Sequence, residues 1–159
     1  MKLIRQTKAG SKYELSRREG DCLKSLLRQF PVTAPAHARI TRTDTEPAVR
    51  EREKLLNESL AEHRAELKQL AANLLAKMKS VEKGYSLALD PEERETLLQI
   101  LNDIRVGCWH VLGEPEELEP ETMPESEREQ VFFDVMNLAG YFEAALLRDF
   151  SGGLQPGHD

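Results

Sequence analysis

The residues best suited to molecular recognition lie on one flank of an expected helix over residues 91–112. Asn102, Arg105 and Trp109 follow one another at intervals of three and four, so they stack along one edge of that helix. An arginine can hold a carboxylate while its plane lies on an indole face, and Trp and Arg are frequent in binding hot spots. Gly140, on a small-residue face of a later helix, would let another backbone approach. We therefore predict a protein- or ligand-binding surface that involves these four residues.

The same flank also suits an internal role. Arg105 would then pin an Asp or Glu of a neighbouring helix, Asn102 would satisfy loop carbonyls, and Trp109 would fill a gap between helix and sheet. Both interpretations stay open on the sequence alone.

Basic side chains near the start of the chain could contact phosphates. The candidates are Lys8, Lys12, Arg17 and Arg18. Tyr13 is the only aromatic residue among them, so stacking on bases would be poor, and the acidic remainder of the chain would repel a phosphate backbone. Nucleic-acid binding is therefore the alternative hypothesis, and nucleic acid is not the expected partner.

Catalytic and metal-binding patterns are missing from the sequence. There is no Gly-x-Gly-x-x-Gly, no P-loop, no Gly-x-Ser-x-Gly and no pair of histidines at metal-ligand spacing. Cys108 and His110 are two positions apart, which points them about 200° from each other on a helix. The row Glu58, Glu62 and Glu66 lacks the Glu-x-x-His of a helical metal bundle. We expect no catalytic residue, no metal and no cofactor, and we expect that the protein is not an enzyme. An active site formed only across a dimer stays an open alternative.

Composition indicates one helix-rich domain. The 159 residues are 40% hydrophobic, 31% charged and only 6% aromatic, which argues against an all-β sandwich or barrel. The net charge of −6 is unevenly placed: residues 1–54 carry 13 basic and 7 acidic side chains, and residues 55–159 carry 9 and 21. Such an asymmetry can mark a nucleic-acid-binding arm, but the two halves more often face each other or stay solvated.

Location follows from what the sequence does not contain. No apolar run approaches the ~20 residues of a membrane span. The opening MKLIRQTKAGSKYEL has no apolar core of a secretory signal, and two cysteines make no disulfide framework. We expect a cytoplasmic protein with no membrane partner.

The pattern of a strand–cap–helix unit occurs twice along the chain. A β-hairpin is predicted over residues 2–15, followed by a capping box at Ser16 and Glu19 and by a helix that Pro31 ends. A second β-like run over residues 84–89 leads into a second capping box at Asp90 and Glu93. We predict that the strands of the two units pair in one small sheet.

The longest helical pattern follows a Pro- and Thr-containing linker over residues 31–46. Its apolar stripe predicts a helix packed on a helical neighbour and ended by Gly84. The stripe consists of Val49, Leu56, Leu60, His63, Leu67, Leu70, Leu74 and Met78. His63 could serve as a pH switch or a general base, but a ring that covers apolar neighbours is the simpler interpretation. An internal capping box at Ser59 leaves open a joint near Asn57.

A last helix is predicted from a capping box at Thr122 and Glu125 onward. Its core stripe is Val131, Val135, Leu138, Phe142, Leu146 and Phe150. Before it, residues 113–123 form a glutamate- and proline-rich stretch that we expect to be a mobile acidic loop, and residues 151–159 should be a disordered tail. The expected fold is thus mainly α: a single domain over residues 1–150, with four or five helices and a small N-terminal β hairpin or sheet.

Three short motifs carry a family resemblance. The segments LDPEE (residues 89–93), LNDIR (residues 101–105) and the closing LG (residues 112–113) resemble an uncharacterised bacterial family known only as a domain of unknown function, number two-zero-one-seven. Its members also begin with a basic β-like segment before a capped helix and end in an amphipathic helix. Residues 109–110, Trp-His, depart from the pattern. The resemblance implies a compact helical cytoplasmic protein of no established activity, often encoded near Clp adaptor genes.

We therefore predict a non-enzymatic interaction protein, an adaptor or regulator, whose partner is another protein. The apolar excess on residues 91–112 and 131–150 also allows a homodimer.

Overall fold

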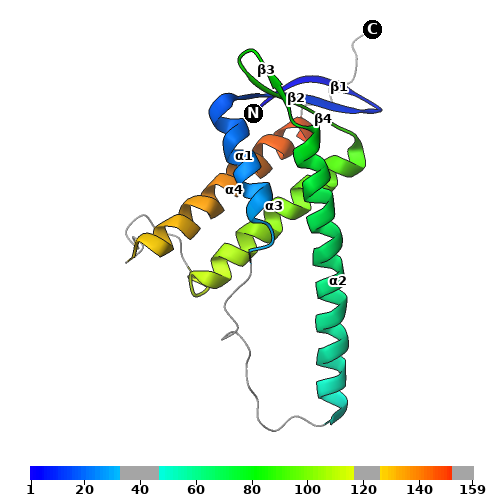
Figure 1. Cartoon of the computed structure of the whole chain (residues 1–159), viewed down its shortest axis with the longest axis vertical. Coiled ribbons are helices and arrows are strands. Elements are labelled where there is room, and N and C mark those ends of the chain that lie inside the picture. The colour runs from blue at the N-terminus through cyan, green and yellow to red at the C-terminus, as the bar shows by residue number, and fades with distance from the viewer. Residues whose placement is uncertain (33–46, 117–125, 152–159) are drawn as a thin grey trace.

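The computed structural model describes residues 1–32, 47–116 and 126–151, which form four helices and four strands (Figure 1). The strands are β1 (Lys2–Thr7), β2 (Gly10–Ser16), β3 (Lys79–Val81) and β4 (Gly84–Leu89). The helices are α1 (Arg17–Gln29), α2 (Pro47–Lys77), α3 (Pro91–Val111) and α4 (Glu127–Ser151). The prediction of a mainly α chain with a small β element is confirmed.

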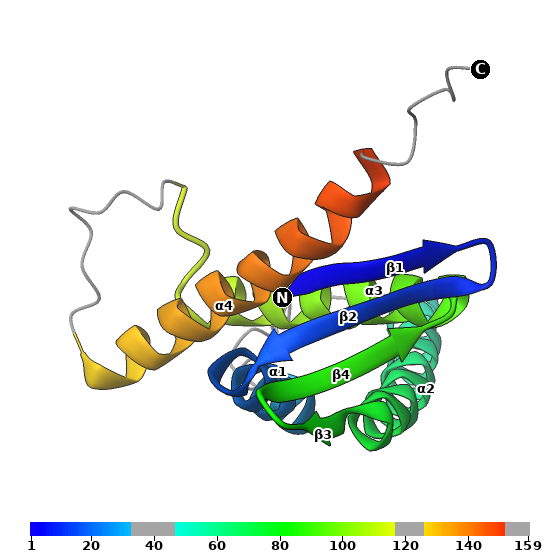
Figure 2. The ribbon, with the colours of Figure 1, turned by 90° about the horizontal axis from the view of Figure 1, so that it is seen from above.

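The β element is larger than a hairpin. β1 and β2 do form the predicted hairpin, but they continue into a four-stranded antiparallel sheet of order β1-β2-β4-β3. Figure 2 views the sheet from its open side, with α1 and α3 behind it. β3 was not predicted, because three residues are too few to show an alternating pattern.

The two strand–cap–helix units are confirmed. Both capping boxes form: the Ser16 hydroxyl accepts from the Glu19 amide, and the Asp90 carboxylate accepts from the Glu93 amide. The alignment that places Ser16 on Asp90 also places Tyr13 on Leu87, and those two residues face each other in the β2–β4 ladder. The order β1–β2–α1 therefore repeats as β3–β4–α3 about an approximate two-fold axis through that pair.

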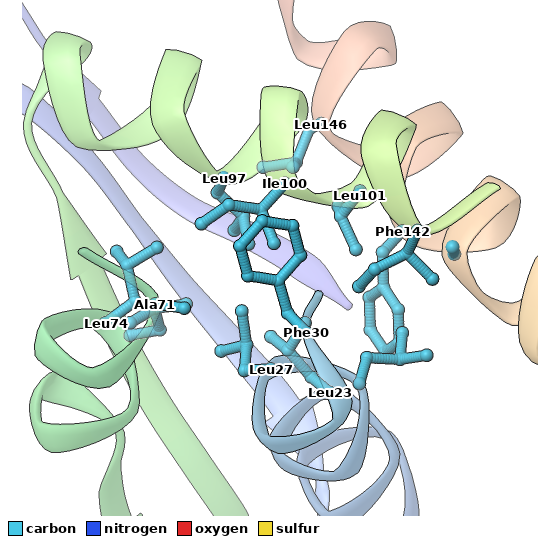
Figure 3. Packing of buried hydrophobic residues seen from close by; sticks show 14 of the residues in the cluster. Leu23, Leu27, Phe30, Ala71, Leu74, Leu97, Ile100, Leu101, Phe142 and Leu146 are labelled. Atoms are coloured by element: carbon cyan, nitrogen blue, oxygen red, sulfur yellow. The ribbon is translucent and has the colours of Figure 1, made fainter. Parts of the chain in front are cut away.

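One hydrophobic core joins the inner face of the sheet to all four helices. Figure 3 shows Phe30, at the end of α1, between Leu27 of its own helix and Leu97 and Ile100 of α3. Burying a side chain of this kind stabilises the fold by roughly 1.5–3 kcal/mol. The fully buried members are Tyr13, Leu23, Leu26, Leu87, Leu89, Leu97, Ile100, Leu101, Ile104, Cys108, Ala139, Phe142 and Leu146.

Helix α4 lies along α3 and is fixed to it at several levels. Phe142 and Leu146 of the predicted stripe are buried, whereas Val131 is exposed. The guanidinium of the buried Arg94 on α3 donates to the Leu146 carbonyl. The structure therefore confirms an amphipathic last helix packed on the core.

Helix α2 is a single helix, which settles the question of a joint near Asn57 that the sequence left open. It ends at Lys77, not at Gly84 as predicted, and β3 and its turn intervene. Gly84 instead starts β4, where a Cβ atom would lie 2.1 Å from the Leu15 carbonyl oxygen. A glycine is required there because two backbones approach closely.

Some of the predicted features fall on residues outside the described ranges. They are most of the linker over residues 31–46, the later part of the acidic stretch over residues 113–123, the capping box at residues 122–125, and the tail beyond Ser151. The described part of α4 begins at Glu127, where the Ser126 hydroxyl accepts from the Glu129 amide.

Candidate functional site

The structure brings two of the four predicted surface residues, Arg105 and Gly140, into direct proximity. The guanidinium of Arg105 on α3 lies 2.5 Å from the carboxylate of Glu143 on α4. A Cβ atom at Gly140 would lie 3.6 Å from Nε of Arg105, so the arginine side chain extends past this glycine. Glu143 is nearly buried while the Arg105 side chain is half-exposed. This ion pair joins the two helices, as the internal alternative for Arg105 expects.

On α3, Trp109 lies one turn after Arg105 and Asn102 lies one turn before it. The Trp109 indole is half-buried, and its Nε1 donates to the Pro115 carbonyl oxygen at 3.2 Å, which anchors the chain just after α3. Asn102 is exposed. The flank thus combines internal contacts with an accessible edge, and its role as a contact surface stays a prediction.

A second candidate lies on the opposite side of α3. There α2 and α3 diverge from each other, and a hollow of about 230 Å³ lies between them. Its α2 wall is Leu60, His63 and Arg64, its α3 wall is Asp103, Val106, Gly107 and His110, and its floor is Phe30, Pro31 and Val32. We call this hollow the α2–α3 cleft.

Sequence reasoning missed the α2–α3 cleft. It gave Asp103 and Val106 no role, and it considered His110 only as a partner of Cys108. The apolar stripe of α2 was the signal that could have found it. Leu60 and His63 continue the same helix face as Leu67, and a face of this kind indicates a contact surface along the whole stripe.

The α2–α3 cleft has both polar and apolar walls. The Gln99 amide nitrogen lies 2.9 Å from Nε2 of His63, and Nδ1 of His110 lies 2.6 Å from a Glu114 carboxylate oxygen. Burial raises the pKa of Asp103, although His63 and Arg64 act in the opposite direction. An entering segment would therefore meet cationic and imidazole groups beside one partly buried carboxyl group.

We call the first twenty residues of α2, residues 47–66, the arm; it includes the cleft residues Leu60, His63 and Arg64 and continues beyond the cleft to the start of the helix. Every residue of the arm is exposed, and Figure 1 shows the N-terminal part of α2 standing apart from α3. Leu56 and Leu60 are 60% and 44% exposed, yet they continue the buried line of Leu67 and Leu74. Val49, Leu56 and Leu60 are exposed, so the helical neighbour predicted for this part of the stripe is not found among the described residues.

The four basic candidates do not form one cluster. Lys8 lies in the β1–β2 turn and Lys12 on β2, whereas Arg17 and Arg18 begin α1 at the far end of that strand. Lys12 instead shares a shallow hollow of about 510 Å³ with Arg5 and Lys77. This hollow also contains Asp90.

Among the residues that the structure describes, no three His, Cys, Asp or Glu side chains come together as potential metal ligands. Within the same ranges, no helix has the length and apolar character to cross a membrane.

No family model, curated protein or solved structure matches this chain. The resemblance described above thus stays an expectation, and function has to be argued from the geometry.

Proposed function

We propose that this chain is a non-enzymatic interaction protein, an adaptor or regulator, that binds another protein chain through its arm and the adjoining α2–α3 cleft. The observation that carries the proposal is the arm's apolar stripe, which runs through Leu56 and Leu60 and has no cover among the described residues.

Energetics support this use of the arm. The arm extends the packed part of α2, but most helical stability in proteins comes from packing, which the arm lacks among the described residues. Covering a large apolar side chain contributes roughly 1.5–3 kcal/mol, so a partner on this stripe would stabilise the arm as it binds. The arm is therefore best suited to protein contacts made along a helix.

The test is a pull-down with the tagged full chain, with and without nuclease and at low and high salt. Leu55 and Leu56 are equally exposed neighbours at 61% and 60%, but only Leu56 lies on the stripe. A protein that survives nuclease and salt, is lost with Leu56→Glu and is retained with Leu55→Glu would support the proposal. Retention by both variants would exclude the arm as the binding element.

The α3–α4 flank is a second contact surface of the same proposed function. If it binds a partner, Arg105→Ala and Trp109→Ala should each weaken capture in a protein that circular dichroism shows to be folded. If neither variant changes capture, the flank serves only the Arg105–Glu143 pair and the anchoring of Pro115.

Nucleic-acid binding is the alternative function, and the hollow with Arg5, Lys12 and Lys77 is the feature that favours it. Binding through this hollow should weaken steeply with salt and with Lys12→Glu, and Lys8→Glu in the neighbouring turn should weaken it less. A salt-independent signal in a fluorescence-anisotropy titration with labelled oligonucleotides would remove this alternative.

We include a cytoplasmic location in the proposal. Cys22 and Cys108 are both free thiols, which suits a reducing compartment.

A further inference from the structure

We infer that the chain bound by the arm is a second copy of this protein, paired antiparallel so that each arm enters the α2–α3 cleft of the other copy. This inference rests on the proposed function, that the arm binds protein. It adds the identity of the partner, the orientation and the register.

The apolar pattern of the arm fits a two-helix seam. Val49, Glu53, Leu56, Leu60 and His63 follow one another at intervals of four, three, four and three. This is the spacing at which two helices pack over an extended length. In an antiparallel pair centred at residue 58, Leu56 lies opposite the partner's Leu60, and the two-fold axis generates the same contact again.

Charge selects the antiparallel orientation. In that register Glu53 lies opposite the partner's His63, and Arg52 lies near the partner's Glu66. A parallel pair would instead set Glu53 against the partner's Glu53 and His63 against the partner's His63. The like-charged approach of Arg50 to the partner's Arg64 takes place beside Asp103, whose carboxyl group lines the same cleft.

The α2–α3 cleft already has the chemistry that the partner's segment 50–56 requires. In this register the partner's Leu56 packs on the exposed Leu60 and Val106, which line the cleft. The partner's Glu53 meets Arg64 and His63. Because Nε2 of His63 accepts from the Gln99 amide, the ring proton lies on Nδ1 and can be donated to that carboxylate.

The same segment also brings a positive charge to the partly buried carboxyl group of the cleft. Asp103 lines the cleft beside His63 and Arg64, and the partner's Arg50, which the register places on the Arg64 side, would bring a further guanidinium to it. Leu56, Glu53 and Arg50 of the partner therefore match the apolar, basic and acidic parts of the cleft in one register. That threefold match is the reason to place a second copy there.

The experiment is sedimentation equilibrium of the full chain from about 1 to 200 μM. We expect a mass twice the 18.1 kDa of the single chain that falls to the monomer on dilution. Leu56→Glu should raise the dissociation constant by roughly 100-fold or more, because in a two-fold dimer one substitution removes two leucine side chains from the interface. Leu55→Glu should change the dissociation constant less than about threefold. A monomer over the whole range, or equal effects of the two variants, would overturn the inference.

A charge-exchange cycle tests the orientation. Arg52→Glu and Glu66→Arg should each weaken the dimer, and the double variant should restore it, because the antiparallel register exchanges the two charges. A double variant no tighter than the weaker single variant would overturn the antiparallel register.

The outcomes separate this inference from the proposed function. A chain that stays monomeric but captures a different protein, lost with Leu56→Glu and kept with Leu55→Glu, overturns the second copy and leaves the proposed function standing. A monomer with no such partner overturns both.

Discussion

Helices α2 and α4 follow the two repeated units in the same order, yet they are used differently. α4 comes after α3 and is covered along its inner face, where Phe142 and Leu146 are fully buried. α2 comes after α1 and is covered only from Leu67 onward, and its first twenty residues are all exposed. Similar amphipathic patterns thus produce one helix that completes the core and one that leaves it.

The lengths of the supporting helices explain this difference. α3 runs for 21 residues and supports α4 beyond the core. α1 runs for only 13 residues and ends at Gln29, with Phe30 as its C-cap directly before Pro31. Because proline cannot continue a helix, the arm extends past the last turn that could have supported it. Among the described residues, the apolar stripe through Leu56 therefore has no supporting helix.

The largest expected effect distinguishes the two helices by stability. Phe142→Ala should lower the free energy of unfolding by roughly 3–5 kcal/mol, because it empties a fully buried site. Leu56→Ala should change it by less than about 0.5 kcal/mol in dilute solution, because that side chain is exposed in the single chain. Urea denaturation at low protein concentration measures both values. Comparable losses would mean that the arm is packed within its own chain.

The next effect concerns the hydrogen bond between Tyr141 of α4 and Glu19 of α1, which joins α4 to the rest of the fold. Burial alone would raise the pKa of Glu19, but hydrogen bonds from the amino terminus, from the Tyr141 hydroxyl at 2.5 Å and from the Ser16 amide lower it to about 2. The folded pKa lies below the ordinary 4.5, so this stability is present above pH 4.5 and is lost as the pH falls toward 2. Solvent screening keeps the contribution below about 3 kcal/mol.

Removing the Tyr141 hydroxyl tests that link. Tyr141→Phe should cost about 1 kcal/mol at pH 7 and should move the acid-induced loss to higher pH, because the pKa of Glu19 rises toward its ordinary value. Urea denaturation at pH 7, 4 and 3 gives both results. An unchanged acid profile would show that Glu19 is held by its other two donors.

The smallest effect tests how closely α3 and α4 approach. A Cβ atom at Gly140 would make an ordinary contact, 3.6 Å from Arg105, so Gly140→Ala should stabilise the protein by about 0.5 kcal/mol through helix propensity. Gly20→Ala is the matched contrast, because its Cβ would lie 1.9 Å from the Tyr85 ring, and it should destabilise by about 1–3 kcal/mol. Thermal unfolding compares them, and a loss on Gly140→Ala would mean that the two helices need the glycine.

Local chemistry made much of the fold predictable. The capping boxes at Ser16 and Asp90 depend on residues three positions apart, so the sequence alone located both helix starts. The pairing of the two units followed from their matched patterns. Gly84 was misassigned because a close approach to the Leu15 backbone depends on a strand far away in the sequence.

The candidate site was less predictable, because it depends on where helices end relative to one another. Periodicity indicated that Leu56 and Leu60 share a face with Leu67, but it carried no information on whether a neighbour is long enough to cover them. For the same reason, the cleft face of Asp103, Val106 and His110 received no role. Arg105 was placed on the correct flank, while its partner Glu143 on α4 could only be named by residue type.

Amide hydrogen exchange over residues 48–66, measured at about 2 and 200 μM protein, tests the central claim most directly. If the arm is covered by another copy, its amides should exchange fast in dilute solution and should become protected at the higher concentration. Leu55→Glu should retain this protection and Leu56→Glu should lose it, while the amides of α4 stay protected throughout. Exchange over residues 48–66 that is the same at both concentrations and in both variants would contradict the account.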